Sequence, residues 1–357
     1  MDEHTKELRW IRILLIIIAL PVLVLILKTL KSIFIPLVFA IFLSFVFAPL
    51  TGYLRRKKVH IYVIMLTMVV IILLVSFGIV LLMSAATNNL ISGFPKYQAR
   101  LFLLVQDGVA KFEQISAKMD IALSNFPRLD ITQMLSPGSF NISKTVSDVM
   151  ATTLGIGWNY FLIVIFLLFL IAQGGQFEQR LKNALKDSDH QRTSTTLANI
   201  QKQIQRYLLT KTVISLCTAG VGMILMLLYG VDFILICGIL LFVLNFIPNI
   251  GSIVASTVPI LICLLQGGLD IRFVTFSLLI IATQMLFGNI IEPKVQGNRL
   301  NLSPITILVS LIFWGWVWGI VGMILAVPIT SAINIILIQF DEKNVISAII
   351  SGDRKVA

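Results

Sequence analysis

Two long stretches without a charged residue limit what this chain can fold into. The first lies between Asp232 and Asp270 and has 37 residues, and the second lies between Arg299 and Asp341 and has 41. A continuous helix of either length would extend about 55–60 Å, nearly twice the thickness of a bilayer core. Within a membrane protein, each stretch must therefore break or fold back.

The composition of the chain predicts such a membrane protein. Of its 357 residues, 57% are hydrophobic and 13% are charged, and the mean hydropathy is +0.95. Soluble domains have about 45–50% apolar and about 25% charged residues, because charged side chains cover their surface. Lipid can solvate the excess apolar side chains, so the composition excludes a soluble enzyme and predicts an all-α polytopic membrane protein.

Apolar runs near the length of a bilayer crossing predict about six full spans. A span is expected at each of 11–27, 33–51, 61–86, 153–172, 210–229 and 273–291.

Each uncharged stretch also carries helix-breaking residues near its middle. In 245–251, Pro248 removes a backbone donor and Gly251 permits a tight turn, and the second stretch has Gly315, Gly319 and Gly322. The halves on either side of a break have about 12–20 residues, which is short for two full spans. We therefore expect two re-entrant helical hairpins, at 233–267 and 304–339, which brings the total to about eight transmembrane segments.

The net charge of +11 is interpreted as a topology signal, not as a sign of nucleic-acid binding. The segments 52–60 and 173–211 are rich in Lys and Arg and therefore belong in the cytoplasm. This orientation places both termini inside, the segment 87–152 outside, and the two hairpins in opposite orientations.

The predicted organisation has six parts. We expect the external segment to form an amphipathic helical hairpin, and the basic linker to form an interfacial helix at the cytoplasmic surface. The parts are an N-terminal three-span unit (1–86), the external segment (87–152), a fourth span (153–172), the cytoplasmic amphipathic linker (173–209), a transport core with both hairpins (210–341) and a cytoplasmic tail (342–357). A Gly followed by Val-Pro-Ile, at Gly251 to Pro259 and again at Gly319 to Pro328, suggests two related hairpins, as in secondary transporters.

The chemistry available at the breaks is neutral. No predicted span has a charged residue near its middle, which argues against a proton pump or voltage sensor. Amides, hydroxyls and indoles suit an uncharged, hydroxylated small molecule better than an ion, although Ser and Thr also bond their own helix and Trp also marks the membrane interface. The expected substrate pathway contains Asn245, Pro248, Asn249, Gly251, Gln284, Asn289, Trp314, Gly315, Gly319 and Gly322.

Glu292 is interpreted as a gate residue or, equally, as a solvated helix-end partner of Lys294 or Arg299. The three cysteines fall in apolar runs, so no disulfide or metal site is expected. The chain has no nucleotide-binding motif. We therefore expect no catalytic residues, cofactor or nucleic-acid partner, and any transport is secondary or facilitated.

Several motifs carry a family resemblance. Residues 246–251 (FIPNIG), 292–297 (EPKVQG), 302–304 (LSP) and 314–322 (WGWVWGIVG), with Pro259 and Pro328, resemble those of the autoinducer-2 exporter family of bacterial inner-membrane transporters. The resemblance implies export of a small furanone-type quorum-sensing signal in some members and sodium/proton antiport in others. It also implies a homo-oligomer, a pentamer, and an elevator-like movement of the hairpin-bearing half.

Three functions remain open from the sequence. The favoured one is a secondary exporter of a small polar organic molecule, with autoinducer-2 as the expected substrate and both breaks at the site. The alternative is a monovalent cation (sodium)/proton antiporter, which would depend on Glu292, Asp232 or Asp270 near the membrane faces. The third is a membrane scaffold or regulator acting through 87–152. The expected partners are the substrate, the lipid bilayer and further copies of the chain, and the expected location is the bacterial inner membrane.

Overall fold

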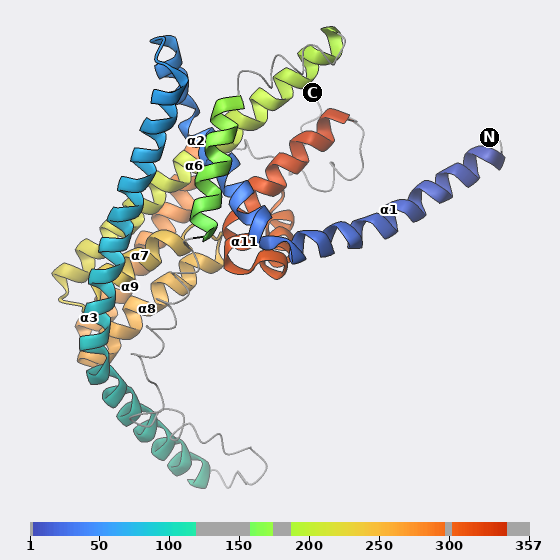
Figure 1. Ribbon diagram of the computed structural model, residues 1–357. Coiled ribbons are helices and arrows are strands. Elements are labelled where there is room, and N and C mark those ends of the chain that lie inside the picture. Colours follow the sequence, from blue (N-terminus) through green and yellow to red (C-terminus); the bar gives the residue numbers. More distant parts are fainter. Residues whose placement is uncertain (1–2, 119–157, 174–186, 297–301, 341–357) are drawn as a thin grey trace. The chain divides into compact units, whose positions relative to one another are not determined.

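The computed structural model describes residues 3–118, 158–173, 187–296 and 302–340, and these parts of the chain form helices joined by short turns (Figure 1). The elements are α1 (Glu3–Thr29), α2 (Lys31–Arg56), α3 (Ile61–Lys118), a short helix Trp158–Gln173, α6 (Asp187–Leu228), α7 (Ile234–Leu244), α8 (Ile250–Gly267), α9 (Ile271–Met285), the π-helix η2 (Leu286–Ile291), α10 (Glu292–Gln296) and α11 (Pro304–Phe340).

Six described helices are long and apolar enough to cross a membrane, which confirms the all-α polytopic class. Two of the expected spans correspond instead to shorter apolar helices, Ile17–Thr29 within α1 and Trp158–Gln173. The six candidates are Lys31–Arg56, Ile61–Tyr97, Ala198–Leu228, Ile250–Gly267, Ile271–Val295 and Pro304–Leu337. The re-entrant placement of the hairpins and their opposite orientations stay predictions.

The chain divides into two compact units. Unit 1 contains residues 1–72, 156–212 and 292–357, and unit 2 contains residues 73–155 and 213–291. The chain passes between them inside α3, inside α6, at the junction of η2 and α10, and at 155–156, which lies outside the described residues. The two units are described separately below.

In unit 1, apolar side chains of α2, the beginning of α3 and the helix Trp158–Gln173 form a core. Its fully buried members are Ala40, Ile64, Met68, Ile72, Leu167 and Ile171. Arg55, near the end of α2, donates from Nη2 to the Ile171 carbonyl oxygen at 2.7 Å. This bond satisfies one of the carbonyls that a helix leaves unpaired at its C-terminus.

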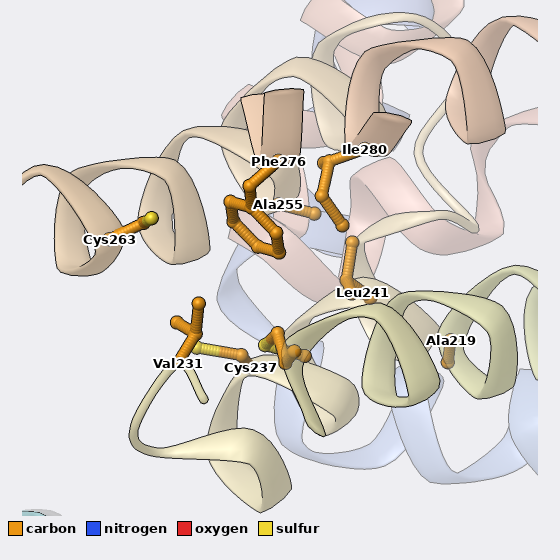
Figure 2. Packing of buried hydrophobic residues seen from close by; sticks show 9 residues of the cluster. Ala219, Val231, Cys237, Leu241, Ala255, Cys263, Phe276 and Ile280 are labelled. Atoms are coloured by element: carbon orange, nitrogen blue, oxygen red, sulfur yellow. The ribbon is translucent and has the colours of Figure 1, made fainter. Parts of the chain in front are cut away.

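In unit 2, the core is formed by α6, α7, α8 and α9. Figure 2 shows Ile280 of α9 pointing towards Leu241 of α7 within this cluster. Gly222 of α6 lies against the same leucine, since a Cβ there would be 2.6 Å from Leu241 Cδ1. A small residue on α6 thus lets the helices approach closely, as is common in membrane proteins.

Each uncharged stretch folds back on itself. In α11, Thr330 donates to Ser310 at 2.9 Å, although a straight helix would separate these residues by about 30 Å. The backbone of α11 leaves the helical region at Gly319, which divides it into 304–318 and 320–340. In the first stretch α7 and α8 are separate helices, and the residues at their far ends, Asp232 and Gln266, bond neighbouring turns of α3.

The structure adds to the expectations about the external segment and the basic linker. The segment 87–118 is helical and is continuous with the preceding span in α3 (Ile61–Lys118), while 119–152 lies outside the described residues, so the hairpin stays a prediction. The linker helix is likewise continuous with the next span in α6. Its apolar stripe is buried in protein, with Ile200 and Ile204 at 7% and 2% exposure, so it is not a separate helix lying on a lipid surface.

Candidate functional site

The break between α7 and α8 is built around two asparagines. Asn245 ends α7, is buried, and donates from Nδ2 to Ser215 Oγ of α6 at 3.0 Å. Asn249 precedes α8 with φ 61° and ψ −57°, the strained conformation of a classic γ-turn, and its side chain is exposed. The tip thus has one amide fixed inside the unit and one amide at its surface.

Pro248 and Gly251 make this turn tight. Pro248 follows the last turn of α7, and its carbonyl accepts from Ile250 N at 2.7 Å. Gly251 lies directly on the carbonyl of Leu244, because a Cβ at this position would overlap that oxygen. Only glycine permits this approach without a backbone shift.

The break in α11 has the same construction. Gly319 has φ 66° and ψ −146°, close to a region that only glycine populates readily. A Cβ at Gly322 would overlap the carbonyl oxygen of Trp314, and one at Gly315 would lie 2.9 Å from the Met323 side chain. The second half of α11 therefore packs back against the end of the first half.

Indole side chains attach this tip to the end of α1. Trp318, 6% exposed, donates from Nε1 to the Leu27 carbonyl oxygen at 3.0 Å. Trp316 is 59% exposed, and Lys28 Nζ lies 3.8 Å from the centroid of its ring. The indole of Trp318 thus satisfies a carbonyl in the last turn of α1, where helices lack internal donors.

Polar side chains are also buried behind the α11 tip. Beyond the bond between Thr330 and Ser310, Ser331 and Asn334 are buried at 0% and 1% exposure. Such groups are uncommon in an apolar helix and mark places where a polar ligand or water can be held.

In unit 2, α9 carries buried hydrogen-bonding groups that have no partner within the described part of the chain. Among the described residues, nothing bonds the Oε1 and Nε2 atoms of Gln284, which are shielded from solvent, and the same holds for Ser277 Oγ, two turns earlier. Asn289 lies in η2 and is exposed. An unpaired buried amide costs about 1–3 kcal/mol, so Gln284 is a strong candidate for contact with a polar ligand.

A buried ion pair lies in unit 1. Lys211 Nζ is 2.7 Å from both carboxylate oxygens of Glu292, and the two side chains are 3% and 19% exposed. Glu292 thus has a buried partner, Lys211, besides the expected helix-end candidates Lys294 and Arg299, and Arg299 lies outside the described residues. Lys211 is at the edge of the predicted span 210–229 but well inside the candidate span Ala198–Leu228, so the expectation that no span has a charged residue near its middle does not hold for this helix.

The α3 helix supports the base of the α7–α8 hairpin. Tyr97 donates a hydrogen bond to Asp232, just before α7, and Arg100 Nη1 donates to the Gln266 carbonyl oxygen in α8 at 2.6 Å. Phe233, with φ 59°, packs edge-on against Tyr97. Sequence reasoning missed this cluster, although Asp232 and the aromatic residues around it were visible signals.

The predicted pathway residues fall into two groups. Asn245, Pro248, Asn249, Gly251, Gln284 and Asn289 belong to unit 2, and Trp314, Gly315, Gly319, Gly322 and Glu292 belong to unit 1. Within each group the residues of a helical break are close together, while Gln284 and Asn289 lie on a neighbouring helix.

Together these features define a polytopic α-helical membrane protein with two helical breaks, one between α7 and α8 and one within α11. The profile of the AI-2E family transporters matches residues 13–341, and the chain belongs to this family.

Several curated proteins are similar to the chain over most of its length. A Borreliella burgdorferi protein, provisionally named a transport protein, is 31% identical over 87% of this chain and 82% of its own length. A Haemophilus influenzae protein with the same provisional name is 30% identical over 87% of each chain. The AI-2 transport protein TqsA of Escherichia coli is 29% identical over 91% of this chain and 92% of its own length.

Proposed function

We propose that the protein is a secondary transporter that exports a small, neutral, polar organic molecule, with autoinducer-2 as the substrate. The observation that carries the proposal is the buried amide of Gln284, which has no partner among the described residues, on the same helix as the buried hydroxyl of Ser277, in a family of transporters. Neutral donors and acceptors in an apolar surrounding suit a hydroxylated solute. The likeness to the AI-2 transport protein TqsA supports the choice of autoinducer-2.

The proposal includes an elevator-like movement of the hairpin-bearing core, 210–341. The helical breaks between α7 and α8 and at Gly319 support this part of the proposal, because discontinuous helices form the substrate site in many secondary transporters. We further propose that the protein works as a homo-oligomer, a pentamer, in the bacterial inner membrane with both termini in the cytoplasm. The large apolar side chains exposed along α1, from Leu14 to Ile26, provide surface for lipid or for further copies.

Everted membrane vesicles test the proposal directly. Vesicles containing the protein should accumulate labelled autoinducer-2, and Gln284→Leu should reduce the initial rate by about tenfold or more if the amide contacts the substrate. Thr257→Val is the matched control, because Thr257 is exposed and its hydroxyl bonds only its own helix, at the Ile253 carbonyl oxygen. Absence of uptake by the wild-type protein, or unchanged uptake by Gln284→Leu, would contradict the proposal.

A second function, sodium/proton antiport, is favoured by one observation. Lys211 and Glu292 form an ionisable pair inside candidate spans, and such groups commonly lie on ion or proton pathways. In this case addition of sodium to everted, acidified vesicles should collapse the pH gradient, and Glu292→Gln should prevent the collapse. A gradient that sodium does not change would exclude this function.

A further inference from the structure

The Lys211–Glu292 pair lies where the chain passes between the two units. Lys211 is the second-to-last unit 1 residue before α6 enters unit 2, and Glu292 is the first unit 1 residue after the chain returns. The ion pair thus joins the end of one unit 1 segment, just before the chain enters unit 2, to the start of the next unit 1 segment, just after the chain returns.

The two passages next to the ion pair, at 212–213 and at 291–292, differ in stiffness. The outgoing passage lies inside α6, which is unbroken from Asp187 to Leu228. The returning passage is the π-helix Leu286–Ile291, which is followed by only five residues of α10. π-Helical turns are uncommon, have an extra residue per turn and often occur at functional sites, so η2 is the more deformable connection.

Stability alone does not explain the pair. Removing two charges from water costs several kcal/mol per ion, and well-packed apolar residues often stabilise a protein as well as a buried ion pair does. A buried pair can instead specify one arrangement of the elements that carry it. Here those elements are the rigid helix α6 and the end of the deformable connection η2.

We propose that the Lys211–Glu292 pair is a staple that fixes the end of the η2 connection to α6, so that the conformation of η2 depends on the pair. Lys211 and Glu292 then act as positioning residues, and what matters is their opposite charge, not which of them carries the carboxylate. The consequence for transport rests on the proposed function, because η2 lies within the core that would move during transport.

Hydrogen exchange in the full-length protein tests the staple without a substrate. The variants are Lys211→Met, Glu292→Gln and the exchanged pair Lys211→Glu with Glu292→Lys. Backbone amides of 286–296 should exchange about tenfold faster in each single variant and return to wild-type rates in the exchanged pair, while amides of α8 stay unchanged. Lys294→Met is the control, because it removes an exposed charge from α10 without touching the pair.

Each result decides the proposal. Single variants with wild-type exchange in 286–296, or an exchanged pair whose exchange stays fast, would overturn it. If one single variant cannot be purified folded, the other single variant and the exchanged pair give the answer, because one breaks the pair and the other keeps both charges. Autoinducer-2 uptake is measured in parallel, and the exchanged pair should restore at least half of the wild-type rate.

The same experiment separates the staple from the function proposed above. A wild-type protein that moves no autoinducer-2 refutes the proposed substrate, while the exchange data still test the staple. An exchanged pair that recovers slow exchange but not sodium-driven proton movement indicates that the carboxylate at 292 has an ion-binding role of its own.

Discussion

At the residue scale, the two helical breaks share two features: a residue with positive φ and a glycine in close contact with a backbone carbonyl. The amino acids that provide the positive φ differ between the two breaks. A residue with positive φ starts the return, Asn249 in the first hairpin and Gly319 in the second. A glycine then packs on the carbonyl of the incoming helix, Gly251 on Leu244 and Gly322 on Trp314. In both breaks the residue that supplies this carbonyl lies five positions before the residue with positive φ. Leu244 precedes Asn249 by five positions, and Trp314 precedes Gly319 by five.

This correspondence corrects the internal similarity seen in the sequence. The sequence pattern matched Gly251 with Gly319, because each is a glycine followed by Val-Pro-Ile. In the structure Gly251 has the role of Gly322, and the role of Gly319 is taken by an asparagine. Residue identity was misleading because Asn249, which is not a glycine, has the positive φ of the first break, whereas a residue with a Cβ does not fit at either close approach.

We predict that Gly251→Ala lowers the free energy of unfolding by about 1–3 kcal/mol, because the added methyl must displace the Leu244 carbonyl. The measurement is thermal unfolding of the purified protein in detergent. Gly220→Ala is the control, since a Cβ at Gly220 of α6 meets nothing within 4 Å and alanine favours a helix by about 1 kcal/mol. Equal stabilities for the two variants would contradict the close approach.

A second prediction concerns the indole at the α11 tip. Trp318→Phe should lower the free energy of unfolding by about 1 kcal/mol, because the Leu27 carbonyl loses its donor. Trp316→Phe should change it by less than about 0.5 kcal/mol, since Trp316 is exposed and phenylalanine keeps an aromatic face for Lys28. The prediction fails if Trp316→Phe is the more harmful of the two in thermal unfolding.

At the scale of the elements, proline alone does not predict where these helices break. Pro36, Pro259 and Pro328 lie inside continuous helical segments, whereas Pro248 lies in a turn. In membrane helices neighbouring groups can satisfy the carbonyl that a proline leaves unpaired. The breaks were nevertheless predictable, because an asparagine and a glycine accompany the proline in the first break and glycines mark the second.

Helix continuity and long-range pairing were not predictable in the same way. Hydropathy predicts that the spans in α3 and α6 end where the sequence becomes polar. Both helices nevertheless continue into polar sequence, because a helix pairs its backbone N–H and C=O groups internally in lipid and in water alike. Lys211 was assigned to a loop since it borders a polar segment. Its partner Glu292 is 81 positions away, and only the fold brings the two charges together.

The extension of α3 gives a prediction at this scale. Tyr97→Phe should weaken the base of the α7–α8 hairpin by about 1–2 kcal/mol, because Asp232 loses a donor while Phe233 keeps its strained φ. Hydrogen exchange of the segment 230–234 should rise, and Arg100→Gln should have the same effect at 266–270. Asn89→Ala, an exposed change on the same helix, should alter neither segment. Unchanged exchange in Tyr97→Phe would show that the hairpin base does not depend on α3.

At the scale of the whole molecule, sequence and structure constrain different properties. Composition predicted the fold class, because a soluble protein with so large an excess of apolar residues could not cover its surface with charged side chains. The orientation of the chain in a membrane depends on the Lys and Arg residues in its short loops, so the prediction of orientation comes from the sequence.

Three single cysteines test the predicted orientation in a protein with Cys217, the exposed native thiol, replaced by serine. Cysteines replacing Lys57, after α2, and Ile305, at the start of α11, should react with a membrane-impermeant thiol reagent only from the cytoplasmic side. A cysteine replacing Leu269, 84% exposed between α8 and α9, should react only from the opposite side. The physical reason is that the loop at 52–60 carries four basic residues, Arg55 to Lys58, which resist translocation. Labelling of 57 and 269 from the same side would refute the orientation, and labelling of 305 from the outer side would refute a return of the chain to the cytoplasm through η2.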